Sequence, residues 1–118
     1  MKHVLVIRPD GTIKQRSWPK GTNEQLHFLQ EQVGGYIETV RTGTPGIIMI
    51  VNEEGLIRGL QYNELATRVY LEGLGASPIM GPAVLVRDAG EEFDGMDTGD
   101  ANLMMGHLFE LKEQEVHA

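Results

Sequence analysis

The chain has 118 residues, of which 41% are hydrophobic and 23% charged, and its formal net charge is −7. This length fits one domain with one hydrophobic core. The absence of cysteine excludes disulfides and thiolate metal sites. No apolar run approaches the roughly 18 residues that a membrane-spanning helix needs, and the first residues lack the pattern of a signal peptide, so we expect a cytoplasmic protein.

The charge is unevenly distributed along the chain. Residues 1–60 contain seven basic and six acidic residues, whereas residues 61–118 contain three and eleven. The densest basic group, which consists of Arg8, Lys14, Arg16 and Lys20, is too small for a duplex-binding surface, so nucleic-acid binding is not expected. The acidic, glycine-containing segment 88–100 is interpreted as a solvated loop.

Hydrophobic periodicity and turn residues divide the chain into eight predicted elements. Alternating or continuously apolar segments indicate strands, and apolar residues repeated every three or four positions indicate helices. In chain order the elements are strands at 3–8 and 12–18, a helix at 23–33, strands at 36–41 and 47–51, a helix opened by Asn63 and closed by Gly73, a strand at 79–87 and a helix that begins at Asp97 or Thr98. The order β-β-α-β-β-α-β-α predicts an α+β fold with a mixed or mostly antiparallel sheet and helices mainly on one face.

Some local predictions concern the surface. Pro82 interrupts the last strand, which is therefore expected at a sheet edge or with a bulge, because proline cannot donate to a strand ladder. An exposed edge is a template for another chain, so a homodimer is expected. Residues 56–58 are interpreted as a short returning strand and residues 75–78 as a loop. In the C-terminal helix the apolar stripe is expected to consist of Leu103, Met104, Leu108 and Leu111.

Few residues are of a type that carries chemistry. The two serines lie outside any nucleophile-elbow sequence, and no phosphate-binding glycine loop is present. The four histidines lack the close spacing of metal ligands, so neither a metal nor another cofactor is expected. Glu38 and Glu53 form a candidate carboxylate pair if their strands are neighbours, although each also fits a solvent-facing or turn position. Asn63 is interpreted as a helix N-cap in preference to a ligand-facing amide.

Four segments together resemble a known family. They are Val-Leu-Val-Ile-Arg-Pro-Asp-Gly at 4–11, Val-Gly-Gly-Tyr-Ile-Glu at 33–38, Val-Asn-Glu-Glu-Gly at 51–55, and Asn63-x-x-Ala66. Their order and spacing resemble a small domain family of unknown function from bacteriophages, notably those of actinobacteria, and from mobile elements. The resemblance covers residues 3–87. It implies a phage-derived setting, implies no catalytic residue, and divides the single domain 1–118 into a family-like core, 1–87, and an acidic loop with the C-terminal helix, 88–118.

Three hypotheses for function follow. The preferred one is a non-catalytic accessory protein that binds a host protein or its own copy, in counter-defence or host takeover, through a strand edge or the acidic C-terminal helix. The alternative is a binder of a small nucleotide-like signal, in which arginines 8, 16, 41 and 58 meet phosphates and Tyr36 or Trp18 stacks on a base. The last is an enzyme that uses Glu38 with Glu53. The candidate binding residues are Tyr36, Glu38, Arg41, Asn52, Glu53, Arg58 and Asn63.

Overall fold

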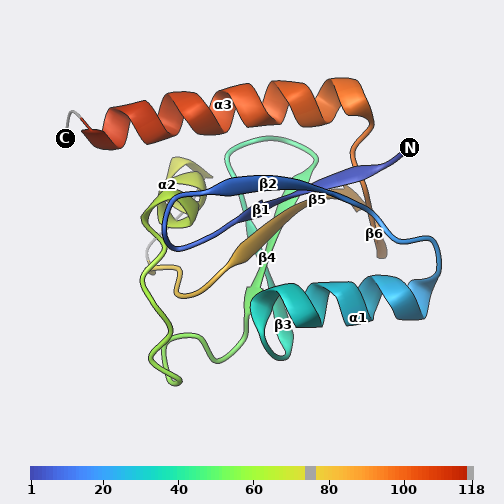
Figure 1. The fold of residues 1–118 in the computed structure, drawn as a ribbon, viewed down its shortest axis with the longest axis horizontal. Coiled ribbons are helices and arrows are strands. Elements are labelled where there is room, and N and C mark those ends of the chain that lie inside the picture. The colour runs from blue at the N-terminus through green and yellow to red at the C-terminus, as the bar shows by residue number, and fades with distance from the viewer. Residues whose placement is uncertain (74–76, 117–118) are drawn as a thin grey trace.

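Two hairpins joined by one central strand build the sheet. The computed structural model describes residues 1–73 and 77–116. Its strands are β1 (His3–Ile7), β2 (Ile13–Ser17), β3 (Ile37–Arg41), β4 (Ile47–Asn52), β5 (Ala83–Ala89) and β6 (Glu92–Asp94). They form one six-stranded sheet in the order β2-β1-β5-β4-β3, with β6 paired to β5, and these pairings are all antiparallel. β5 thus lies between the β1–β2 hairpin and the β3–β4 hairpin (Figure 1).

Helices cover both faces of the sheet. They are α1 (Thr22–Val33), α2 (Glu64–Gly73) and α3 (Thr98–Val116). Because side chains alternate along a strand, Val4 and Val6 of β1 pack in one cluster with α1, whereas Leu5 and Ile7 pack in the other with α2 and α3. Figure 1 shows α1 and α3 on opposite sides of the sheet. The predicted α+β fold with an antiparallel sheet is confirmed. Two of the three helices share a face, and α1 covers the other.

The prediction drawn from Pro82 is wrong. β5 pairs with β1 on one side and with β4 on the other, so it is central, and the edges of the sheet are β2 and β3. Pro82 directly precedes the first residue of β5, where its missing N–H interrupts no ladder bond. Gly81, at a φ of 89°, makes the bend that leads into the strand.

The segment predicted as a loop over 88–100 is mostly ordered secondary structure. β5 continues to Ala89, the chain turns at Gly90, whose N–H donates to the Asp88 carboxylate, and β6 returns. Asp94 of β6 accepts a hydrogen bond of 3.2 Å from the Lys2 ammonium and lies 3.9 Å from the Arg87 guanidinium. Partial burial raises the pKa of Asp94, but the hydrogen bonds from Lys2 and the Gly95 N–H, with the charges of Lys2 and Arg87, together outweigh it, and the pKa falls below its usual value.

Other local predictions are also corrected by the structure. Residues 56–58 form turns instead of a strand, and residues 75 and 76 of the predicted 75–78 loop lie outside the described residues. Leu103 is exposed, and the buried stripe of α3 consists of Ala101, Met104, Leu108 and Leu111. α1 begins after its N-cap Gly21, which has no side chain to form a cap, and the Gln25 side chain donates to the Pro19 carbonyl. Within the described ranges no helix is long and apolar enough to cross a bilayer.

Candidate functional site

Asn52 ties three segments together at the end of β4. Its amide nitrogen donates to the Val33 carbonyl at 3.0 Å, and its amide oxygen accepts from the Glu54 N–H at 2.7 Å. The first bond holds the C-terminus of α1, where Gly34 adopts the left-handed conformation that ends a helix. A Cβ on Gly35 would lie 3.0 Å from the Asn52 amide nitrogen, so glycine allows this close approach. Asn52 is buried and structural.

Asn63 is a second buried anchor. Its side-chain oxygen accepts from the Ala66 N–H at 3.0 Å, which is the predicted N-cap of α2. Its amide nitrogen donates to the carbonyls of Ile7 and Gly81, at 3.0 and 2.9 Å. Because both donor hydrogens are used and the residue is fully buried, the Asn63 amide joins β1, α2 and the approach to β5 and offers no donor to a ligand.

Glu38 and Glu53 line one cleft. β3 and β4 are neighbours, with Glu38 opposite Val51, so the condition for the carboxylate pair is met. The cleft has a volume of about 290 Å³ and lies between the β3–β4 hairpin, Tyr70 of α2 and the segment 77–80. Among the described residues neither glutamate forms an ion pair, and no lysine or arginine lines the cleft. The cleft therefore suits a cationic or hydrogen-bond-donating group.

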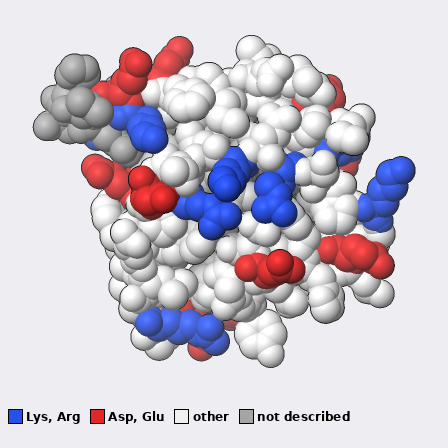
Figure 2. Space-filling model, viewed as in Figure 1, with Lys and Arg blue, Asp and Glu red and all other residues white. Residues whose placement is uncertain are grey.

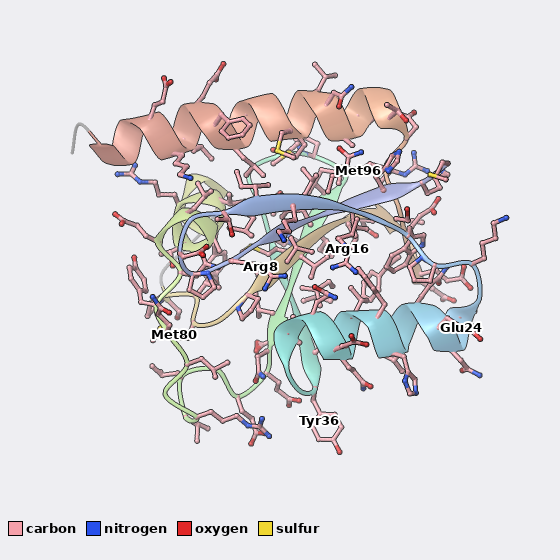
Figure 3. All side chains as sticks on the ribbon, viewed as in Figure 1. Arg8, Arg16, Glu24, Tyr36, Met80 and Met96 are labelled. Atoms are coloured by element: carbon pink, nitrogen blue, oxygen red, sulfur yellow. The ribbon has the colours of Figure 1, made fainter. Side chains whose placement is uncertain are left out.

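Large apolar side chains are exposed beside this cleft. Leu56, which lines the cleft, is 69% exposed, and Ile57 is 84% exposed. Tyr36 is 68% exposed, and its carbonyl accepts from the Glu53 N–H at 2.9 Å, so it adjoins the same turn. Its ring projects from the margin of the molecule (Figure 3). We call Tyr36, Leu56 and Ile57 the apolar rim.

The turn that presents the rim is held from within. Arg58 donates to the Gly34 carbonyl at 3.3 Å and lies 3.6 Å from the Glu54 carboxylate. A Cβ on Gly55 would lie 2.7 Å from the Met80 carbonyl, so this glycine lets the turn approach the segment before β5. Arg58 thus braces the turn, and the rim is displayed on a fixed backbone.

The remaining residues of the nucleotide hypothesis are dispersed. Arg41 lies at the far end of β3, on the face opposite that of Glu38. Arg8 and Arg16 lie over the β1–β2 hairpin, apart from Tyr36 (Figure 3). Trp18 is only 8% exposed and packs edge-on against Phe28, so its faces are not open for stacking on a base.

Sequence reasoning missed the apolar rim at Leu56 and Ile57. The available signal is their position: two aliphatic residues follow Asn-Glu-Glu-Gly inside a polar turn, where burial is not expected. Tyr70 and Met80, which also line the cleft, were recognisable only through the packing of α2 and the segment before β5.

Two further observations bear on alternative sites. A hollow of about 520 Å³ lies between the turn before β4 and α3, with a mainly apolar lining that includes Leu103 and Met104. Within the part of the chain that the structure describes, no three histidine or acidic side chains are grouped as metal ligands would be, and His117 lies outside it.

Comparison with known proteins gives one match. Residues 1–109 match the model of a family described as a domain of unknown function, DUF3846. The match extends past residue 87 through β6 and into α3, so most of the segment that the sequence set apart from the core is part of the domain. No curated protein and no solved structure matches the chain.

Proposed function

The chain belongs to the DUF3846 family of domains of unknown function, and we infer its function from its surface. We propose that the domain is a non-catalytic binding protein. Its contact surface is the Glu38–Glu53 cleft with the apolar rim, and its partner is a protein that presents a basic side chain beside apolar ones. The observation that carries this proposal is the exposure of Tyr36, Leu56 and Ile57 next to two carboxylates without ion pairs.

The composition of this surface matches that of protein interfaces. Exposed apolar groups bordered by polar residues mark interaction sites, and tyrosine is enriched among residues that dominate binding energy. A lysine or arginine from the partner would be met by the two carboxylates, while its neighbours cover the rim. The turn is braced by Arg58 and Asn52, so little ordering of the loop opposes association.

The setting of this interaction is part of the proposal. The resemblance to phage and mobile-element domains supports a host protein as the partner, bound in the host cytoplasm during counter-defence or host takeover. The exposed apolar rim supports this cleft, in preference to the acidic helix α3, as the primary contact surface, and the strand edge expected from Pro82 is absent because β5 is central. A small nucleotide-like ligand is less well supported, because Arg8 and Arg16 lie apart from Tyr36, Arg58 is engaged by Gly34 and Glu54, and Trp18 is buried.

Site-specific photocross-linking in host cells tests the proposal. A photoreactive amino acid placed at Ile57 is expected to give a discrete adduct with one host protein. The same amino acid at Leu103 is the matched control, because Leu103 is 76% exposed but lies on α3. The adduct at position 57 should disappear when Glu38 and Glu53 are both replaced by lysine, since like charges then face the partner's basic group.

Three outcomes contradict the proposal. An adduct at position 57 that is insensitive to the double charge reversal excludes the cleft. Adducts confined to position 103 place the interface on α3. Turnover of a small molecule that Glu38→Gln or Glu53→Gln abolishes, in a folded protein, shows instead that the carboxylate pair is catalytic.

A further inference from the structure

The outer edge of β2 carries unpaired backbone groups. The Trp18 N–H donates to the Lys2 carbonyl and the Arg8 N–H to the Thr12 carbonyl, each at 2.9 Å, at the two ends of the β1–β2 ladder. Hydrogen-bonded pairs alternate along an antiparallel ladder, so even-numbered residues of β2 bond to β1. The N–H and C=O groups of Ile13, Gln15 and Ser17 therefore point outward, where no described residue bonds to them.

Basic side chains line one face of this edge. Lys14 pairs across from Val6 and Arg16 from Val4, so both project on the α1 side of the sheet, and Arg8 follows Val6 by two residues on the same face. None of the three forms an ion pair within the described part of the chain. Figure 2 shows basic side chains gathered at the centre of the view, over the β1–β2 hairpin. In a protein of net charge −7 this group stands out.

The residues around Arg16 favour binding of an acidic ligand at the outer edge of β2. They disfavour binding in the hollow that lies between Arg16 and α1. The Arg16 guanidinium lies over the Phe28 ring, 5.8 Å from its centre, which fixes its position. The hollow between Arg16 and α1, of about 480 Å³, is also lined by Glu24 and Glu31, whose carboxylates repel an anion placed inside it. Positive charge is thus offered at the strand itself, while the carboxylates of Glu24 and Glu31 lie toward α1.

The edge also disfavours a second copy of itself. In an antiparallel pairing of two β2 strands, Lys14 and Arg16 would face the same residues of the other copy, and like charges directly opposite each other are destabilising. The complementary partner is an extended strand with carboxylates at alternate positions. Its side chains repeat every ~6.8 Å on one face, which matches the spacing of Lys14 and Arg16 on a strand.

We propose that β2 is a second interaction surface, at which an extended acidic segment of a partner protein adds as an antiparallel strand. Its backbone bonds to Ile13, Gln15 and Ser17, and its alternate carboxylates face Lys14 and Arg16. This surface is separate from the Glu38–Glu53 cleft, and the inference does not depend on the function proposed for that cleft.

Peptide binding tests the inference. The probe is a nine-residue peptide in which glutamate alternates with threonine or valine, and its binding is followed by hydrogen exchange and fluorescence anisotropy. We expect the peptide to protect the amide hydrogens of Ile13, Gln15 and Ser17, which face solvent in the free protein. The double variant Lys14→Glu/Arg16→Glu should bind at least roughly tenfold more weakly, since two opposite-charge pairs become like-charge pairs. Arg41→Glu, a charge reversal on the other edge strand, is the matched control and should bind like the unchanged protein.

Gln15→Pro separates strand addition from simple charge attraction. It removes one outward N–H without changing any charge, at a position where the inward ladder to β1 stays intact. We expect this variant to lose peptide binding while Gln15→Ala retains it. If Gln15→Pro does not fold, the hydrogen-exchange pattern of the unchanged protein decides the question.

Several results would overturn the inference. They are no binding of the alternating peptide, equal binding of a peptide with its glutamates clustered at one end, and peptide binding without protection of the outward amides. Binding of inorganic polyphosphate or single-stranded DNA as tightly as the peptide, unaffected by Gln15→Pro in a folded variant, would show a general anion surface instead.

Discussion

The two buried asparagines and the two cleft glutamates differ in where their polar atoms are used. Asn52 and Asn63 use their amides to bond backbone groups of both their own turns and distant segments, at 2.7–3.0 Å. Glu53 directly follows Asn52, Glu38 lies on the neighbouring strand β3, and neither glutamate forms an ion pair with any described residue. All four are polar residues near turns. What separates architecture from a binding surface is whether the hydrogen-bonding capacity of the side chain is already satisfied inside the protein.

The largest effect is expected from breaking the interior anchor at Asn63. Asn63→Ala removes three hydrogen bonds and leaves the carbonyls of Ile7 and Gly81 without this donor in a buried site. We expect a loss of roughly 3 kcal/mol in the free energy of unfolding, measured by urea denaturation. Glu64→Ala, one residue further on and exposed, is the control and should change stability by less than about 0.5 kcal/mol. A loss below about 1 kcal/mol for Asn63→Ala would show that it is not an anchor.

A smaller effect is expected at Asn52. Asn52→Ala removes two hydrogen bonds from a buried residue and should cost about 2 kcal/mol. Gly35→Ala places a methyl group 3.0 Å from the Asn52 amide nitrogen, so it should destabilise the protein by itself but cost much less when Asn52 is already alanine. A double-mutant cycle measures this coupling. Simple additivity would contradict the close contact between Gly35 and Asn52.

The smallest effect is expected at Asp94. Unlike the two cleft glutamates, Asp94 forms an ion pair with another described residue of the chain, Lys2. Its pKa is lowered in the folded state, so ionised Asp94 contributes stability above its ordinary pKa of 3.8, and this contribution is lost as the pH falls through the lowered pKa. Because Asp94 and Lys2 are partly exposed, Asp94→Asn should cost less than about 1 kcal/mol at pH 7. The difference should shrink in denaturation at pH 3. A difference that grows on acidification would contradict this sign.

The sequence predicted most elements because their signals are local. The alternation in residues 37–41, the continuous apolar run in β4 and the spacing of Leu29 and Val33 depend only on neighbouring residues. The position of β5 could not be predicted in the same way. Proline has the same local effect whether it lies at an edge or just before a central strand, and only pairing with β1 and β4 distinguishes the two.

The candidate site was predictable to a lesser degree. Glu38 and Glu53 line one cleft because the β3–β4 hairpin makes their segments neighbours, which the predicted strand order already suggested. The burial of Asn52 depends on the end of α1, 19 residues away, and that of Asn63 on Ile7, 56 residues away. Periodicity contains no information about such distant hydrogen bonds. Leu56 and Ile57 are exposed because no other described segment covers their turn. This depends on the tertiary structure and cannot be predicted from a local sequence pattern.

The central place of β5 has a consequence for the order in which the protein is made. On the ribosome, the two hairpins emerge first, but the strand that joins them begins only at Ala83. Until it emerges, the nascent chain exposes the bare edges of β1 and β4, with an apolar side chain at most positions. Unpaired edges of this kind promote aggregation. We therefore expect acquisition of the native sheet to be a late, nearly all-or-none event in synthesis, and chains that stop before Ala83 to depend on chaperones for solubility.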